Sequence, residues 1–141
     1  MHKLLIINNL NKKSEANGAL MRVSALATWI AKCTDIDAFI GAEMAMDDAS
    51  LSHPNQVCQE VNAIYVYTLI NLLRGIEPRE ALKYTTQFIE MNTFSEKVRR
   101  WYFEESLDIS KMVCTVQAGH VRWGFVLAFY FLRHPLELNQ I

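Results

Sequence analysis

The chain has 141 residues, and 51% of them are apolar or aromatic, which is typical of one globular domain with a substantial core. Its 14 basic and 15 acidic residues leave a net charge of −1, so we expect neither nucleic acid nor an anionic membrane as a partner. The plentiful aromatic and branched aliphatic side chains exclude an intrinsically disordered chain.

The predicted elements begin with a polar segment, residues 1–16, whose second half is typical of a loop. Apolar residues at helical spacing then predict a helix over residues 21–32. Asp35 is expected to cap a second helix. The apolar face of this second helix is predicted to carry Ile36, Phe39, Ile40 and Met44. A polar break is predicted at residues 47–53.

Prolines and a serine mark the next three helices. Pro54 and Pro78 suit the first position of a third and a fourth helix, and Ser95 can cap a fifth. Gly75 is a natural end for the helix that begins at Pro54.

An uncharged apolar run over residues 123–132 predicts a last helix that ends near Pro135. The aromatic residues of this run would also suit a buried strand, but its length and its lack of a strand partner favour a helix. The run is too short to cross a bilayer. Six helices without an alternating strand predict an all-α fold, an orthogonal bundle of about six helices.

The three cysteines, Cys33, Cys58 and Cys114, are odd in number and widely spaced, with no CxxC pair. This spacing favours neither a disulfide framework nor a zinc site, so we expect buried, reduced thiols. The apolar stretch at residues 4–7 is too short for a signal peptide. We therefore expect a cytoplasmic protein.

Two polar segments are the first candidates for a ligand site. Residues 17–22 form a small-residue turn before a helix, where backbone N–H groups suit a phosphate and Asn17 could donate its amide to a ligand. An ordinary turn and cap explains the same residues. In residues 51–60, His53, Gln56 and Glu60 would lie on neighbouring turns and could line a pocket. A polar loop with an exposed histidine is the alternative.

Two further sets of polar residues have a functional and a structural interpretation. His120 and Arg122, at the start of the last helix, could meet a ligand or be satisfied polar groups at a helix end. The acidic residues could hold a hard cation or cap a helix. They are Asp35, Asp37, Asp47 and Asp48.

Three stretches of the chain together resemble the ADP-ribosylglycohydrolase family. Residues 17–24, NGALMRVS, are similar to a family stretch that reads NGALMR, V or I, then SPL. Residues 51–60, LSHPNQVCQE, are similar to its HPNPVCQE segment, and residues 119–130 to its GWVRxxFVLAFYxL segment. The three occur in the family's order and extend from residue 17 to about residue 132.

The resemblance implies an all-α fold with a binuclear metal site, usually Mg²⁺ or Mn²⁺, and hydrolysis of the glycosidic bond of ADP-ribose on a modified substrate. It implies that Asn17 and Gly18 border the diphosphate and ribose, and that Ser52 and His53 border the same cleft. These four residues are the expected substrate-binding residues. The resemblance assigns no catalytic residue and no metal ligand to this chain.

The sequence departs from the family at the metal ligands. The family takes them from a Thr-Asp-Asp segment and a Gly-Asp-x-Asp-Thr segment, and neither occurs here. The one Asp-x-Asp, residues 35–37, lies between the first two similar stretches, and Ala25 stands where a proline is usual. Mg²⁺ is therefore a family expectation whose ligands are not in this chain.

We accordingly expect a truncated or split ADP-ribosyl glycohydrolase that is inactive by itself. Its expected parts are a polar segment 1–16, a partial family domain 17–135 and a tail 136–141. Faces that the family buries would then be exposed, so self-association or a partner carrying the missing helices is expected. The alternative is an inactive ADP-ribose-binding or structural helical module.

Overall fold

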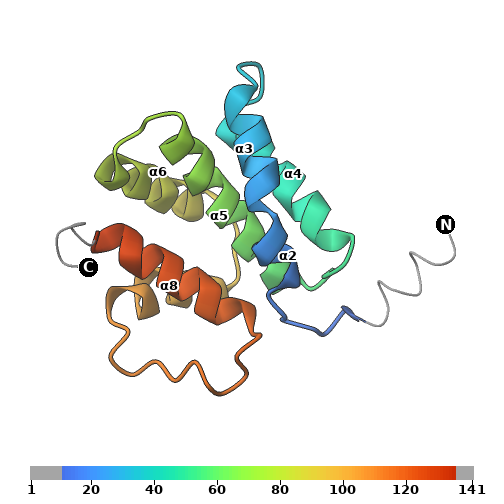
Figure 1. Ribbon diagram of the computed structural model, residues 1–141, viewed down its shortest axis with the longest axis vertical. Coiled ribbons are helices and arrows are strands. Elements are labelled where there is room, and N and C mark those ends of the chain that lie inside the picture. The colour runs from blue at the N-terminus through green and yellow to red at the C-terminus, as the bar shows by residue number, and fades with distance from the viewer. Residues whose placement is uncertain (1–10, 136–141) are drawn as a thin grey trace, which may run out of the picture.

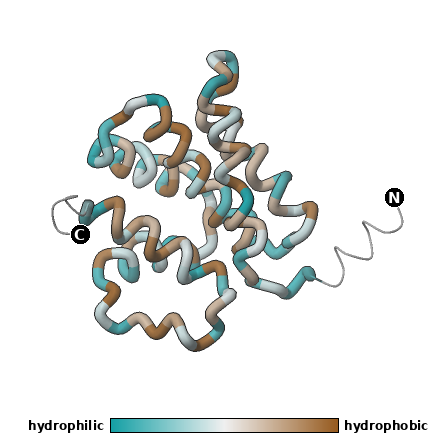
Figure 2. The backbone as a smooth tube through the Cα atoms, in the orientation of Figure 1, coloured by the Kyte–Doolittle hydropathy of each residue, from teal (hydrophilic) through white to brown (hydrophobic). Residues whose placement is uncertain are grey.

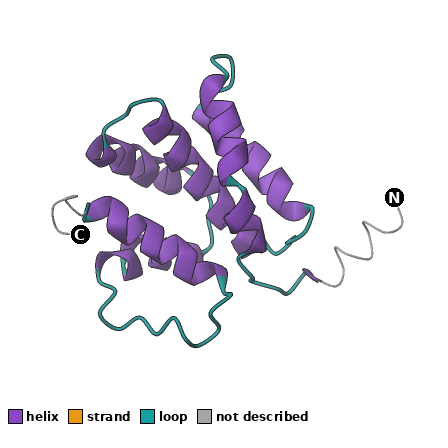
Figure 3. Cartoon of the chain, viewed as in Figure 1, coloured by secondary structure: helices purple, strands orange, loops and turns teal. Residues whose placement is uncertain are grey.

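Residues 11–135 are described by a computed structural model, and they fold into helices and loops (Figures 1 and 3). Residues 1–10 and 136–141, which hold most of the predicted polar segment and the whole predicted tail, lie outside the described residues. The helices are α2 (Gly18–Arg22), α3 (Ser24–Lys32), α4 (Ala38–Ser50), α5 (Gln56–Leu73), α6 (Pro78–Met91), α7 (Glu96–Phe103), the short 3-10 helix η1 (Glu105–Leu107) and α8 (Val121–Arg133). The all-α prediction is confirmed.

Helix α5 is the centre of the fold, with α3 and α4 on one side and α6 and α8 on the other (Figure 1). Apolar residues occur all round this helix rather than on one stripe, which is typical of a buried helix. Its fully buried side chains include Val61, Ile64, Val66 and Ile70. No helix among residues 11–135 is long and apolar enough to cross a membrane.

Helix α4 packs on α5 through its small residues. Gly41, Ala42, Ala45 and Ala49 are buried, and a Cβ at Gly41 would overlap Cδ1 of Ile70. The predicted apolar face was wrong in part, because Phe39 and Ile40 are 47% and 45% exposed. Small side chains let the two helix axes approach closely, so the face with the bulky residues turns outward.

The limits of α4 differ from those predicted. Asp37, not Asp35, caps the helix: its Oδ1 accepts a hydrogen bond from Ile40 N at 2.8 Å. The predicted polar break at residues 47–53 was wrong for its first half, because α4 continues through Ser50. Asp and Asn are favoured wherever the chain is extended just before a helix, and Asp37 has that conformation.

Helices α5 and α2 also begin at other residues than predicted. Asn55 caps α5 by accepting from Val57 N at 2.9 Å, so the helix starts at Gln56 and not at Pro54. The predicted helix 21–32 begins earlier, at Gly18, and divides at Val23 into α2 and α3. The predicted starts at Pro78 and after Ser95 are confirmed.

A single guanidinium holds the turn between α3 and α4 against the end of α5. Arg74 donates to the carbonyl oxygens of Ile30, Cys33 and Ile36 at 3.1, 2.9 and 2.6 Å. These carbonyls lie at or beyond the last turn of α3, where the regular helical donors end, although Ile30 O also accepts from Cys33 N and Cys33 O from Ile36 N. Arg74 therefore does the work of a C-terminal cap from about 40 residues away in the chain.

Helix α8 has a buried and an open face. Val121, Phe125, Val126 and Phe129 are buried against α5, α6, α7 and η1, whereas Phe131 is 45% exposed. Hydrophobic residues also recur along the loop that precedes α8, residues 108–120 (Figure 2).

Candidate functional site

The two predicted ligand segments meet where α2 begins and where α4 turns into α5. A Cβ at Gly18 would lie 2.8 Å from Cε1 and 3.0 Å from Nε2 of His53. The imidazole therefore lies directly against the backbone of Gly18, and a larger residue there would displace the ring. Two of the four expected substrate-binding residues are thus in contact.

Ser52 joins this contact to a charged pair. Its Oγ accepts from Nη1 of Arg22 at 2.7 Å and lies 2.9 Å from Nδ1 of His53. Arg22 also donates to the Asp48 carbonyl at 2.7 Å and pairs with the Asp48 carboxylate at 3.1 Å. The Ser52 hydroxyl has one proton and two acceptor positions, so it can hydrogen-bond to Arg22 and to either tautomer of the His53 ring.

The electrostatics of this cluster favour a neutral imidazole. Burial lowers the pKa of His53 from its ordinary value, and the positive charge of Arg22 lowers it further. Both causes disfavour a second proton on the ring. At pH 7 His53 is therefore a hydrogen-bond donor and acceptor without charge.

Asn17 caps α2 through its backbone. Its carbonyl accepts from Met21 N at 2.9 Å, and its N–H donates to the Gly119 carbonyl at 2.8 Å. Its side chain makes no capping hydrogen bond to the helix. The side-chain amide of Asn17 is therefore not committed to the ordinary capping role that the sequence offered as the alternative.

Gln56 and Glu60 do not line the same site as His53, so that prediction was wrong. Gln56 Nε2 donates to Glu60 Oε1 at 2.7 Å. The other carboxylate oxygen accepts from the N–H and the hydroxyl of Ser95 at 3.0 and 2.5 Å. Glu60 is 2% exposed and holds the start of α7, where a helix favours negative charge.

His120 and Arg122 are satisfied polar groups at the start of α8, as their structural interpretation predicts. His120 Nδ1 accepts from Arg122 N at 3.1 Å and so caps α8, while its Nε2 lies 2.9 Å from Glu15. Lys97 pairs with the same Glu15 carboxylate at 2.6 Å. Arg122 pairs with Glu105 at 2.7 Å. These ion pairs fix the start of α8 to the segment before α2 and to η1.

The acidic residues are separated in the structure. Asp37 caps α4, and Asp48 pairs with Arg22. Across residues 11–135, no group of three or more His, Cys, Asp or Glu side chains could hold a metal ion. The residues described therefore do not fit the binuclear metal site that the resemblance implies.

The three thiols have different surroundings. Cys58 is buried, Cys33 is half-buried and Cys114 is exposed, so the expectation of buried thiols is wrong for Cys114. Burial and the negative charge of Glu15 raise the pKa of Cys58 to about 11. Its thiol donates a hydrogen bond to the Ser14 carbonyl, with Sγ and O 3.5 Å apart. Cys58 is thus a protonated, packed thiol rather than a nucleophile.

Alkylation is expected to distinguish these thiols. At pH 8, iodoacetamide should modify Cys114 first and Cys58 last, because only an accessible thiolate reacts. Peptide mass spectrometry over a time course measures the three rates. In denaturant all three should react alike, and equal rates for Cys58 and Cys114 in the folded protein would contradict the assignment.

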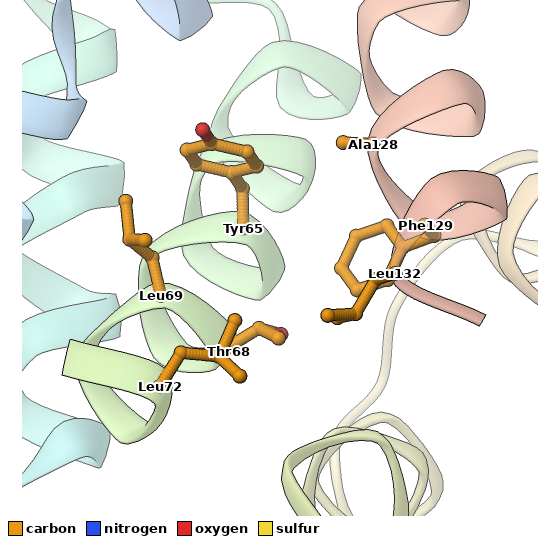
Figure 4. A pocket seen from close by; sticks show the side chains of 7 residues that line it. All are labelled: Tyr65, Thr68, Leu69, Leu72, Ala128, Phe129 and Leu132. Carbon is orange, nitrogen blue, oxygen red and sulfur yellow. The ribbon is translucent and has the colours of Figure 1, made fainter. Parts of the chain in front are cut away.

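An apolar groove lies between α5 and α8, away from the Gly18–His53 contact. Tyr65, Leu69 and Leu72 line it from α5, and Phe129 and Leu132 line it from α8 (Figure 4). The hydroxyl of Thr68, also at this groove, is bonded to the Ile64 carbonyl and to Thr85, so it is not available to a ligand. The groove offers apolar area and little chemistry.

Comparison with known proteins gives one match. The family profile described as ADP-ribosylglycohydrolase matches residues 5–138. No curated protein and no solved structure matches the chain. The matched range includes Gly18, Ser52 and His53 as well as α8. Because it covers nearly the whole sequence, the chain belongs to the ADP-ribosylglycohydrolase family.

Proposed function

We propose that this chain binds an ADP-ribosyl group and forms one wall of the ligand cleft of an ADP-ribosyl glycohydrolase. The ligand-binding residues would be Asn17, Gly18, Ser52 and His53. The observation that carries the proposal is the contact of Gly18 with the His53 ring, which joins two segments that the chain separates by more than 30 residues.

The chemistry of the cluster suits this ligand. Nε2 of a neutral His53 can hydrogen-bond to a ribose hydroxyl, and the side-chain amide of Asn17 can donate to ribose hydroxyls or phosphate oxygens. The absence of a side chain at Gly18 lets the His53 ring lie against the backbone, which holds the ring beside the start of α2. Arg22, whose side chain is 40% exposed, adds a positive charge near an anionic diphosphate.

The proposal for these residues is limited to binding. The family's hydrolysis depends on metal ions, and the described part of the chain has no group of acidic or histidine side chains that could hold one. Any metal ligands would belong to residues outside 11–135, in this polypeptide or in another.

One observation favours the alternative of a purely structural cluster. Ser52, Arg22 and Asp48 hydrogen-bond and pair with one another, as polar side chains do where they only hold loops together. On this alternative ADP-ribose would not bind, and substitution of Ser52 would change stability alone.

Thermal melting with ADP-ribose tests the proposal. A hundredfold excess of ligand over its Kd should stabilise the folded chain by about 2.7 kcal/mol and raise its Tm. Ser52→Ala should weaken binding about fivefold, because the Ser52 hydroxyl orients His53. Ser50→Ala is the matched control, since within residues 11–135 the Ser50 hydroxyl bonds to the Asp47 carbonyl of its own helix and not to the cluster.

The addition of Mg²⁺ to each melt separates the outcomes. A rise in Tm with ADP-ribose alone supports a binding wall without a metal of its own. A rise that requires Mg²⁺ would mean that the chain holds a metal site outside the described residues. A cooperative melt whose midpoint ADP-ribose does not change would contradict the proposal.

A further inference from the structure

A second hollow lies between α4, α5, α6 and the turn that leads to α7. Its volume of 290 Å³ is just below the usual range for small-molecule pockets, which begins at about 300 Å³. It shares no residue with the cluster of Gly18, Ser52 and His53. The residues that line it are Phe39, Ala42, Glu43, Met46, Gln56, Glu60, Ala63, Phe88, Asn92, Thr93 and Phe94.

Aromatic rings form one part of this hollow. Phe88 contacts Phe39 and Phe94, with ring centroids 5.6 and 5.4 Å apart. Phe39 is 47% exposed although the small residues of α4 beside it are buried. An aromatic face carries negative potential, and an exposed face at the rim of a hollow attracts a cation.

Glu60 is a buried carboxylate without a positive partner. It is 2% exposed and lines the hollow, and it accepts three hydrogen bonds, all from the uncharged groups of Gln56 and Ser95. A carboxylate offers about four acceptor positions, so one remains. Among residues 11–135, Glu60 takes part in no salt bridge. The carboxyl group is therefore held by uncharged hydrogen-bond donors and not by a basic side chain.

The rest of the lining increases this negative character. Glu43, on α4, brings a second carboxylate to the hollow, and none of the lining residues is a lysine, arginine or histidine. The four apolar side chains Phe39, Met46, Phe88 and Phe94 supply a surface for a short hydrocarbon chain. Charge and apolar area together define one class of ligand.

We propose that this hollow is a binding site for a small organic cation, an ammonium or guanidinium group carried on a short apolar chain. The cation lies between the Glu43 and Glu60 carboxylates and the aromatic faces, and the chain packs on Phe88 and Phe94. This site and the proposed ADP-ribose site have no residue in common.

Titration followed by ¹H–¹⁵N NMR tests the proposal with defined probes. n-Butylammonium and butylguanidinium should shift the amide signals of residues around Phe39, Glu43 and Phe94. 1-Pentanol, of similar size but neutral, should bind at least about fivefold more weakly. A capped Gly-Arg-Gly peptide distinguishes the source of the cation: comparable binding assigns the site to a protein side chain, and weaker binding assigns it to a free small molecule.

Two variants at exposed positions test the Glu43 charge and the Phe39 ring separately. Glu43→Gln should weaken butylammonium binding about two- to fivefold, the range for a partly exposed ion pair. Glu90→Gln, the same change at an exposed residue of α6 outside the hollow, is the matched control. Phe39→Leu removes the aromatic ring but keeps an apolar side chain. It should therefore weaken the binding of both cations and leave the binding of 1-pentanol unchanged.

The comparison of these variants decides the outcome. Equal binding of 1-pentanol and butylammonium would overturn the proposal, and so would equal effects of Glu43→Gln and Glu90→Gln. Glu60 is left unchanged in these experiments, because it also holds the start of α7 and its substitution would change stability as well as binding. ADP-ribose binding is measured on the same variants and should not change, so this site and the proposed function can fail separately.

Discussion

Phe125→Ala should lower the free energy of unfolding by about 3–5 kcal/mol, the usual range for removing a buried phenylalanine. Phe125 is 0% exposed and packs edge-to-face on Phe129, with ring centroids 4.8 Å apart. Its truncation leaves a cavity between α8 and the central helices, which the surrounding rings cannot fill without moving. Urea denaturation followed by circular dichroism measures the loss.

Phe131→Ala is the matched control for this prediction. It removes the same ring from the same helix, but Phe131 is 45% exposed. The expected loss is smaller, about 1–1.5 kcal/mol, because only about half of this side chain is buried. Similar losses for the two variants would mean that α8 does not bury the face described here.

Gly41→Val should destabilise the fold by about 1–3 kcal/mol, although valine is a better helix residue than glycine. The new Cβ would overlap Ile70 and lie 3.3 Å from Cγ2 of Ile30, and both isoleucines are fully buried. The clash must therefore be relieved by separating α4 from α5, the most extensive helix contact of the fold.

Gly119→Val provides the comparison for Gly41→Val. A Cβ at Gly119 meets nothing within 4 Å, and its backbone has no positive φ. Denaturation of this variant should give nearly the unfolding free energy of the parent. If Gly41→Val were as stable as Gly119→Val, the close approach of α4 and α5 would be contradicted.

Local sequence signals predicted the elements well where each depends on one or two residues. Ser95 and Pro78 begin their helices as expected, because a hydroxyl cap and a proline act on the adjacent backbone. The cap of α4 was misplaced by two residues because Asp35 and Asp37 are chemically equal. Only the extended backbone at Asp37 separates them.

Tertiary contacts account for what the sequence could not predict. The periodicity of α4 placed Phe39 inside, since large apolar residues usually are, but a run of glycine and alanine made the opposite face the better fit to α5. Nothing local to Glu60 or Arg74 points to Ser95 or to the α3–α4 turn. Two signals for the Gly18–His53 contact, NG and HP, were visible, but only the fold brings them together.

Contacts outside the preceding loop hold both ends of α8, in addition to the bonds from Trp123 Nε1 to the Val116 and Gln117 carbonyls of that loop. The start of the helix is held by the bridge between Ala16 and His120 and by the Arg122–Glu105 pair, and its end by the bond from Arg133 to the Tyr102 carbonyl. The intervening loop, residues 108–120, takes part in none of these three contacts except through His120. The chain could therefore be cut or lengthened near residue 114 with all three contacts kept, and doubling the loop would cost only about 0.6 kcal/mol of closure entropy. In evolution and in engineering, this loop is the place where the polypeptide can be reconnected or extended with the least effect on the helices around it.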